Sequence, residues 1–158
     1  MKKCGLVIRV STEGKGAESG NSLTDQLRRL KEHLKCKTEA TGEPWVEAGR
    51  YVLKGVSGKN SLRSKEFAKL FEDVKTGRIN TVMCTALDRI SRSVNELLNF
   101  SEFLSQHRVE FVCLKQSFDT TTPQGKLLTA VMAALAEFER EQMCERMRKA
   151  KRARGTEN

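Results

Sequence analysis

Residues 4–12 read Cys-Gly-Leu-Val-Ile-Arg-Val-Ser-Thr, an apolar run that ends in Arg-x-Ser-Thr and leads into a Gly-rich, charged segment. Such a run predicts a buried parallel strand, and open α/β sheets bind their ligands at the carboxyl ends of these strands. Ser11 therefore lies where a nucleophile would stand. Taken alone, the segment is better explained as a Ser-Thr pair that simply starts a turn. The rest of the chain must decide between a turn and a nucleophile.

The alternation of strand-like and helix-like segments predicts an α/β fold. Further strands are expected at residues 45–52, 79–85 and 109–114, helices from residue 22 and at 64–76 and 94–107, and a polar loop at 117–124. We expect a mostly parallel sheet of four to five strands, flanked by helices and joined by right-handed crossovers. Residues 1–125 would form this core, and residues 126–158 would form one long helix.

The long helix is expected to change character midway. Residues 126–138 are strongly apolar, whereas six Lys or Arg residues and no acid lie between positions 146 and 154. The first half should bury its apolar face in an oligomer, and the second half should project as a cationic rod. A solvated helix face would explain the basic half equally well. The candidate DNA-contacting residues are Arg146, Arg148, Lys149, Lys151, Arg152 and Arg154.

The bulk composition favours a polyanionic partner. The 158 residues suffice for one α/β domain, and 29 Lys and Arg against 20 Asp and Glu give a formal charge of +9. Nucleic acid is the leading candidate. Five cysteines without a Cys-x-x-Cys pair and only two histidines favour neither a disulfide framework nor a metal site. The chain has no long apolar run and no signal-like start, which predicts a soluble protein that is not exported and does not enter a membrane.

Arginine residues follow three of the predicted strands. They are Arg9 two positions before Ser11, Arg63, and the Arg89 and Arg92 of an Asp-Arg-x-x-Arg motif that starts at Asp88. Because the carboxyl ends of parallel strands share one edge of a sheet, these guanidinium groups should surround Ser11. Guanidinium stays charged and its forked donors match phosphate oxygens, where charge gathers when a phosphodiester is attacked. The arrangement predicts a covalent phosphoserine reaction.

Other chemistries fit less well. A two-metal nuclease would need several clustered carboxylates, and only Asp88 stands in a plausible place. Neither a Walker A motif nor a dinucleotide-binding glycine pattern is present. We therefore expect no metal and no nucleotide cofactor. The alternative for the Asp-Arg-x-x-Arg motif is an acid at a helix N-terminus with local ion pairs.

Six short motifs resemble those of one family, in the same order along the chain. They are Arg9-Val10-Ser11-Thr12, Ser22-Leu23-x-x-Gln26, Ser57-Gly58 with Arg63, Leu87-Asp88-Arg89-x-x-Arg92, Gly125-Lys126-Leu127 and Glu139-Arg140. Over essentially its whole length the chain resembles the catalytic domain of the serine recombinases, the resolvase/invertase family. The long interval between Ser11 and Ser22 is most similar to the large serine recombinases of the integrase and transposase type.

The resemblance implies roles for particular residues. Ser11 would be the nucleophile that forms a 5′-phosphoserine link to DNA, and Arg9, Arg89 and Arg92 would hold the scissile phosphate. Supporting positions would be Gln26, Arg63, Asp88, Glu139 and Arg140. It further implies a homodimer that assembles to a tetramer on double-stranded DNA, in the cytoplasm of a bacterium at the nucleoid, with a bacterial, phage or mobile-element origin. Family members continue into a DNA-recognition domain, which is not expected within this chain.

Two other interpretations stay open from the sequence. One is a catalytically inactive DNA-binding and dimerisation module of the same fold, which would have little reason to keep Ser11 together with Arg9, Arg89 and Arg92. The other is a flavodoxin-like ligand-binding domain. The Arg-rich edge of the sheet disfavours that second interpretation.

Overall fold

The computed structural model describes residues 1–10, 22–55, 61–115 and 118–155. The predicted nucleophile Ser11 and the Ser57-Gly58 motif lie outside these residues. The side chains of Glu139 and Arg154 are also outside the described part, although both residues belong to a described helix.

A five-stranded sheet forms the centre of the molecule, in the order β2-β1-β3-β4-β5. The strands are β1 (Lys2–Val10), β2 (Trp45–Lys54), β3 (Thr81–Cys84), β4 (Glu110–Cys113) and β5 (Phe118–Asp119). The first four are parallel, and β5 pairs antiparallel with β4. The predicted α/β fold with a mostly parallel sheet is confirmed. The expected loop at 117–124 is wrong in one respect, because it contains β5, whose two residues are too few to show a strand pattern.

Four helices and two short 3₁₀ turns complete the chain. They are α1 (Leu23–Thr41), η1 (Ser61–Arg63), α2 (Lys65–Lys75), η2 (Leu87–Arg89), α3 (Val94–Gln106) and α4 (Pro123–Gly155). Each of the first three α-helices begins after a serine whose hydroxyl accepts a hydrogen bond from the backbone N–H three residues on: Ser22, Ser64 and Ser93. Such caps satisfy N–H groups that the helix itself leaves unpaired, which fixes where each helix starts.

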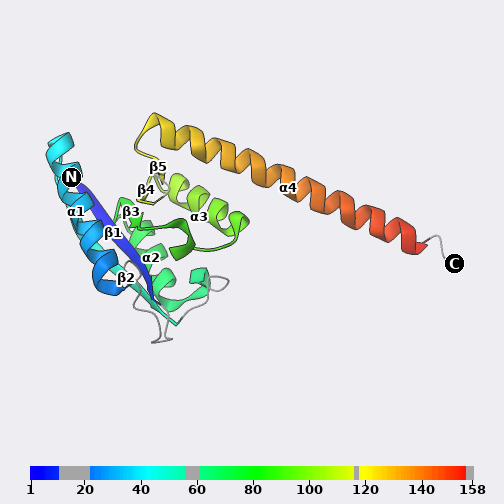
Figure 1. Ribbon diagram of the computed structural model, residues 1–158, viewed down its shortest axis with the longest axis horizontal. Helices are drawn as coiled ribbons and strands as arrows, with labels where there is room; N and C mark the ends of the chain where they lie inside the picture. Colours follow the sequence, from blue (N-terminus) through cyan, green and yellow to red (C-terminus); the bar gives the residue numbers. More distant parts are fainter. Residues whose placement is uncertain (11–21, 56–60, 116–117, 156–158) are drawn as a thin grey trace.

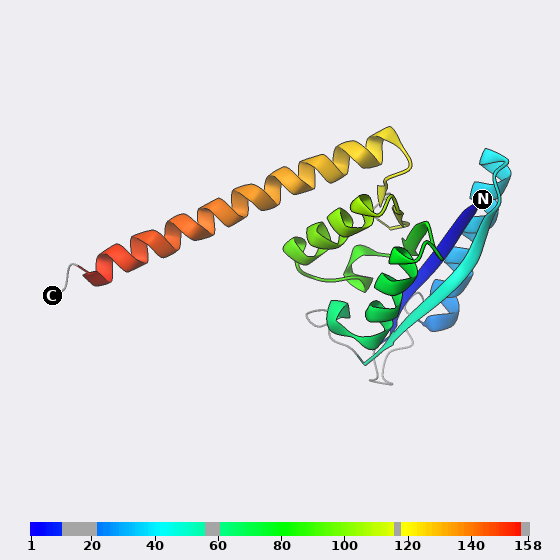
Figure 2. The same ribbon diagram turned by 180° about the vertical axis from the view of Figure 1, so that it is seen from behind.

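The sheet is covered on both faces (Figures 1 and 2). On one face, α1 packs Leu30 and Leu34 against Leu6 and Ile8 of β1. On the other face, the side chains of α2 and α3 form a larger core that includes four packed phenylalanine rings: Phe67, Phe71, Phe100 and Phe103. Because β1 is buried on both sides, it reads as a continuous apolar run instead of an alternating one.

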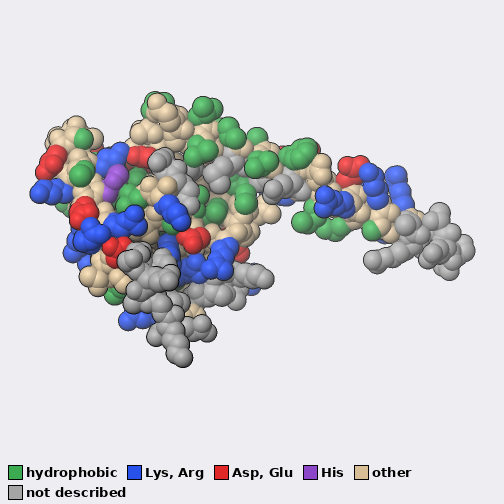
Figure 3. Space-filling model, viewed as in Figure 1, with side chains coloured by type: hydrophobic (Ala, Val, Ile, Leu, Met, Phe, Trp, Pro, Cys, Tyr) green, Lys and Arg blue, Asp and Glu red, His purple; other side chains and the backbone are tan. Residues whose placement is uncertain are grey.

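The helix α4 starts beside β5, runs past α3 and projects beyond the rest of the molecule (Figures 1 and 2). It begins at Pro123 instead of Lys126, because the hydroxyl of Thr122 accepts a hydrogen bond from Gly125 N (3.1 Å) and proline fits the first helical position. Figure 3 shows apolar side chains exposed along it. The exposed fractions are 67% for Leu127, 55% for Val131, 52% for Leu135 and 56% for Phe138. No described helix, α4 included, combines the length and apolar character needed to cross a bilayer.

Candidate active site at the carboxyl ends of the strands

Arg9 at the end of β1 points into the protein and holds the turn that follows β3. Its side chain is 8% exposed, and Nη2 donates a hydrogen bond to the backbone oxygen of Asp88 (2.6 Å). The contact forms because β1 and β3 are adjacent parallel strands, so that Arg9 and η2 come out at the same edge of the sheet. The predicted meeting of these two segments is confirmed.

The backbone oxygen of Arg9 is fixed by two further side chains. Gln26 Nε2 and Arg89 Nη1 each donate to it at 3.1 Å. Gln26 is fully buried and reaches the strand end from the first turn of α1. The chain that leads from β1 toward Ser11 is therefore anchored by groups from α1 and η2.

The cluster carries an excess of positive charge. Burial lowers the pKa of the Arg9 guanidinium, and the charges of Arg89 and Arg92 lower it further, while Asp88 acts in the opposite direction. The Asp88 carboxylate lies 3.9 Å from Arg89 Nε, and the Asp88 side chain is half exposed. Asp88 therefore offsets only part of the repulsion among the arginines. Arg9 Nε is buried and has no hydrogen-bond partner among the described residues. An anion bound beside these guanidinium groups would offset their mutual repulsion.

Arg63 and Arg92 are both exposed. The hydroxyl of Ser61, at the start of η1, donates to the backbone oxygen of Ile90, and this contact holds the turn with Arg63 against the segment with Arg92. Ser61 is completely buried. Sequence reasoning missed this serine, and its proximity to Arg63 in the chain was the only signal that could have pointed to it.

Two predicted positions on α4 are not brought to this cluster within the single chain. The Arg140 side chain is 54% exposed, pairs with Glu137 (3.1 Å) and lines a groove against α3. The side chain of Glu139 lies outside the described part. Their roles at the site stay predictions. The same holds for the basic second half of α4, where the described residues are exposed and Lys149 pairs with Glu145 at 2.8 Å.

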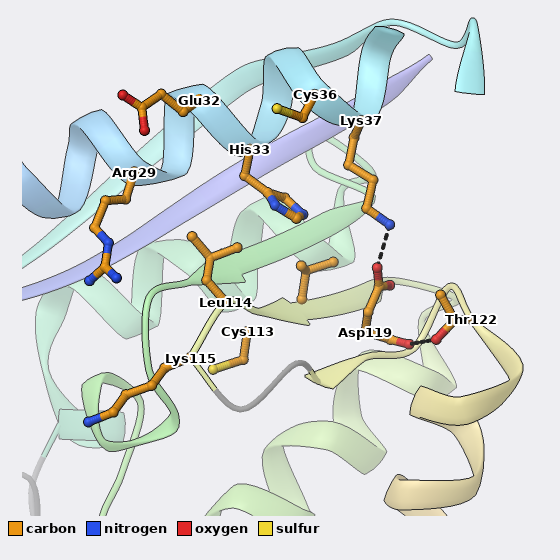
Figure 4. Close-up of a pocket in the computed structure, with 11 residues that line it drawn as sticks. Arg29, Glu32, His33, Cys36, Lys37, Cys113, Leu114, Lys115, Asp119 and Thr122 are labelled. Carbon is orange, nitrogen blue, oxygen red and sulfur yellow. Dashed lines mark hydrogen bonds and ion pairs between the residues drawn. The ribbon is translucent and has the colours of Figure 1, made fainter. Parts of the chain in front are cut away.

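A separate cleft of about 520 Å³ lies between α1 and the strands β4 and β5. Figure 4 shows His33 directed into it and Lys37 reaching across it to Asp119, with 2.5 Å between Nζ and Oδ2. The Lys37 Nζ also lies 5.4 Å from the centre of the Trp45 ring. Burial, followed by the charge of Lys37, lowers the pKa of His33. The Lys37–Asp119 ion pair links α1 to the turn that precedes α4, so we assign this cleft a structural role. Nowhere in the described ranges do three or more His, Cys, Asp or Glu side chains gather as a metal site would need.

Comparison with known proteins identifies the family. The sequence pattern described as "Resolvase, N terminal domain" matches residues 5–157. The chain belongs to the resolvase family. A probable DNA-invertase of Sinorhizobium fredii is 35% identical over 112 residues, which cover 68% of this chain and 36% of that protein. The DNA-invertase of Escherichia phage P1 is 35% identical over 106 residues, or 57% of each protein. The matched regions thus leave large parts of these relatives uncovered.

Solved structures of resolvase-family proteins share the fold. The N-terminal catalytic domain of TP901-1 integrase superimposes with a TM-score of 0.77 and 33% identity, covering 90% of this chain and 99% of that one. A resolvase family site-specific recombinase from Streptococcus pneumoniae gives a TM-score of 0.68 over 99% of this chain, at 24% identity. The predicted resemblance to serine recombinases is confirmed, and the match to an integrase agrees with the predicted likeness to the large members.

Proposed function

We propose that this chain is the catalytic domain of a site-specific DNA recombinase that cuts and rejoins DNA strands through a covalent 5′-phosphoserine at Ser11. The observation that carries the proposal is the arginine cluster at the end of β1. Burial and the charges of Arg89 and Arg92 lower the pKa of Arg9, and the Asp88 carboxylate acts in the opposite direction. Ser11 follows Arg9 by two residues in the chain.

The reaction needs one transesterification in each direction. The Ser11 hydroxyl oxygen would attack the phosphorus and lose its proton, and the bond to the 3′ oxygen would break, so that a free 3′ hydroxyl leaves after gaining a proton. Arg89 and Arg92 would stabilise the charge on the non-bridging oxygens. For rejoining, a 3′ hydroxyl attacks the phosphoserine and releases Ser11. Because the phosphoserine ester conserves the free energy of the broken phosphodiester bond, rejoining would need no ATP. The arginine charges would do at the non-bridging oxygens what a metal ion does in other enzymes.

The remaining site residues would support this step. Gln26 would hold the backbone before Ser11 through its bond to the Arg9 oxygen, and the Arg9 side chain would hold the turn at Asp88. Arg63 is exposed and would add a further phosphate contact. Asp88 would limit the repulsion among the arginines. Glu139 and Arg140 would act on the site only if α4 or a second subunit brings them there.

We further propose that the apolar face of α4 pairs two copies of the chain and that dimers join to a tetramer on double-stranded DNA. Leu127, Val131, Leu135 and Phe138 are each more than half exposed, and they recur at helical spacing on one helix. A contiguous exposed apolar surface of this kind marks an interface, because each square ångström removed from water contributes about 25 cal/mol.

The basic half of α4 should make DNA binding strongly dependent on salt. Replacing Arg148, Lys149, Arg152 and Arg154 by Ala should reduce the slope of log affinity against log salt by about 0.9 for each phosphate that the helix no longer neutralises. Fluorescence anisotropy with a labelled duplex at several NaCl concentrations measures that slope. The matched control replaces four exposed lysines on helices α1 and α2 by Ala: Lys35, Lys65, Lys69 and Lys75. Equal slopes for the two variants would show that the helix does not track phosphates.

The cleavage activity can be tested directly. The chain, or the full-length protein that contains it, is incubated with a duplex carrying its recombination site in EDTA and without ATP, and the reaction is stopped in detergent. We expect a protein–DNA adduct that survives denaturation. DNA binding without any adduct would contradict the proposal and favour an inactive DNA-binding module of the same fold.

A further inference from the structure

The segment of residues 90–93 connects η2 with α3 and carries Arg92. It forms no part of a helix or strand. In its first half, the backbone N–H groups of Ile90 and Ser91 donate hydrogen bonds to the carbonyl oxygen of Leu87 in η2, at 3.0 and 3.2 Å. Side chains from elsewhere therefore contribute to its position. The first is Ser61, whose buried hydroxyl donates to the backbone oxygen of Ile90.

The second contribution is an altered capping box at the start of α3. Ser93 caps the helix by accepting from Glu96 N (3.4 Å), and in the usual box the glutamate three residues on would accept from the N–H of the capping serine. Here Ser93 N donates to the hydroxyl of Ser91 (3.1 Å), and that hydroxyl donates to the Glu96 carboxylate. Ser91 is 1% exposed. The inserted hydroxyl extends the box around Arg92, which lies between the two serines.

We propose that Ser61, Ser91 and Glu96 are positioning residues: they fix the backbone of residues 90–93 and thereby place the exposed Arg92 side chain where it can bind phosphate together with Arg89. This inference rests on the proposed function. None of the three residues is proposed to touch the phosphate. Their effect on phosphate affinity is entropic. Arg92 loses side-chain rotamer freedom when it binds phosphate, and a backbone that is already fixed adds no further entropy cost.

Inorganic phosphate is a probe that needs no knowledge of the DNA target. We would follow the Nε–Hε NMR signal of Arg92, assigned by its loss in Arg92→Ala, during a phosphate titration. Ser61→Ala and Glu96→Ala should each weaken phosphate binding at Arg92 by about tenfold, the effect of losing one net hydrogen bond. Glu96→Gln keeps an acceptor for the Ser91 hydroxyl and should remain within about twofold of the parent.

Ser64→Ala is the matched control for Ser61→Ala. Ser64 lies three residues further on and caps α2, accepting from Phe67 N (3.3 Å). Its hydroxyl donates to the backbone oxygen of Ser61 (2.7 Å) and makes no described hydrogen bond to Ile90, so this variant disturbs the same turn and keeps the Ser61–Ile90 bond. Loss of the Ser64 hydroxyl should lower the melting temperature and leave phosphate affinity at Arg92 unchanged. If Ser61→Ala does not fold, the comparison of Glu96→Ala with Glu96→Gln tests the proposal alone.

The outcomes separate the two levels of the proposal. If Ser61→Ala and Glu96→Ala weaken phosphate binding no more than Ser64→Ala does, the three residues only stabilise the fold and the inference is overturned, while the phosphate site stands. If the Arg92 signal of the parent protein does not respond to phosphate, the phosphate site itself is wrong and the proposed function loses its support.

Discussion

Arg89→Ala is expected to lower the rate of DNA strand cleavage by about a hundredfold to a thousandfold, the usual effect of removing one preorganised donor from a developing charge. Arg89 combines two tasks: its Nη1 anchors the backbone oxygen of Arg9, and its charge contributes to the cluster. Its side chain is only 16% exposed, so water replaces it poorly. Arg89→Lys should also be slow, because an ammonium group lacks the forked geometry.

The measurement is the single-turnover rate of adduct formation at saturating DNA, which separates the chemical step from binding. Arg50→Ala is a suitable control, because Arg50 lies on the edge strand β2 and pairs with Glu47 at 2.7 Å. It removes the same charge and should leave the rate unchanged. A cleavage rate for Arg89→Ala within twofold of the parent would show that Arg89 has no part in the reaction.

Gly125→Ala should destabilise the protein by about 3 kcal/mol, at the upper end of what overpacking costs. A Cβ on residue 125 would overlap the backbone oxygen of Asp119, and backbone cannot move aside as a flexible side chain can. Asp119 is itself fixed, since its carboxylate binds Lys37 of α1 and its backbone oxygen accepts from Thr122 N (3.1 Å). Relief of the overlap would have to displace the start of α4.

Chemical denaturation gives the free energy of unfolding for this variant. Gly42→Ala is the matched control: Gly42 has φ +69° and open space around it, so alanine there meets backbone strain of about 1 kcal/mol and no clash. The Gly125 variant should also lose self-association, because the apolar face of α4 would be redirected. If Gly125→Ala costs no more than Gly42→Ala, the base of α4 is not tightly joined to β5.

The parallel sheet could be predicted because its determinants are local. The apolar run of β1 is buried on both faces, and serine caps and apolar stripes mark the helices next to it. The meeting of Arg9 with the Asp88 segment could also be predicted, since parallel strands β1 and β3 must end at one edge. By contrast, β5 consists of two residues paired through the turn at Asp119, and no sequence pattern marks so short a strand.

The orientation of the site residues was harder to predict than their proximity. Residue type suggested that Arg9 would face a ligand with its guanidinium group, but that group is largely buried and bonded to the backbone oxygen of Asp88. Ser61 contacts the backbone oxygen of Ile90, and Ser91 contacts the N-cap of α3 at Ser93. Both contacts depend on the folded backbone, so no sequence pattern indicates them. Arg140 shows a further limit: its contribution to a site depends on the placement of α4, which one chain alone does not determine.

The most direct test of the account is to identify the residue that carries DNA after cleavage. The adduct is digested with protease and nuclease, and the modified peptide is sequenced by mass spectrometry. We predict a nucleotide joined through its 5′ phosphate to the hydroxyl of Ser11, and no adduct from Ser11→Ala. A nucleotide on any other residue, or an adduct that persists in Ser11→Ala, would contradict the central claim.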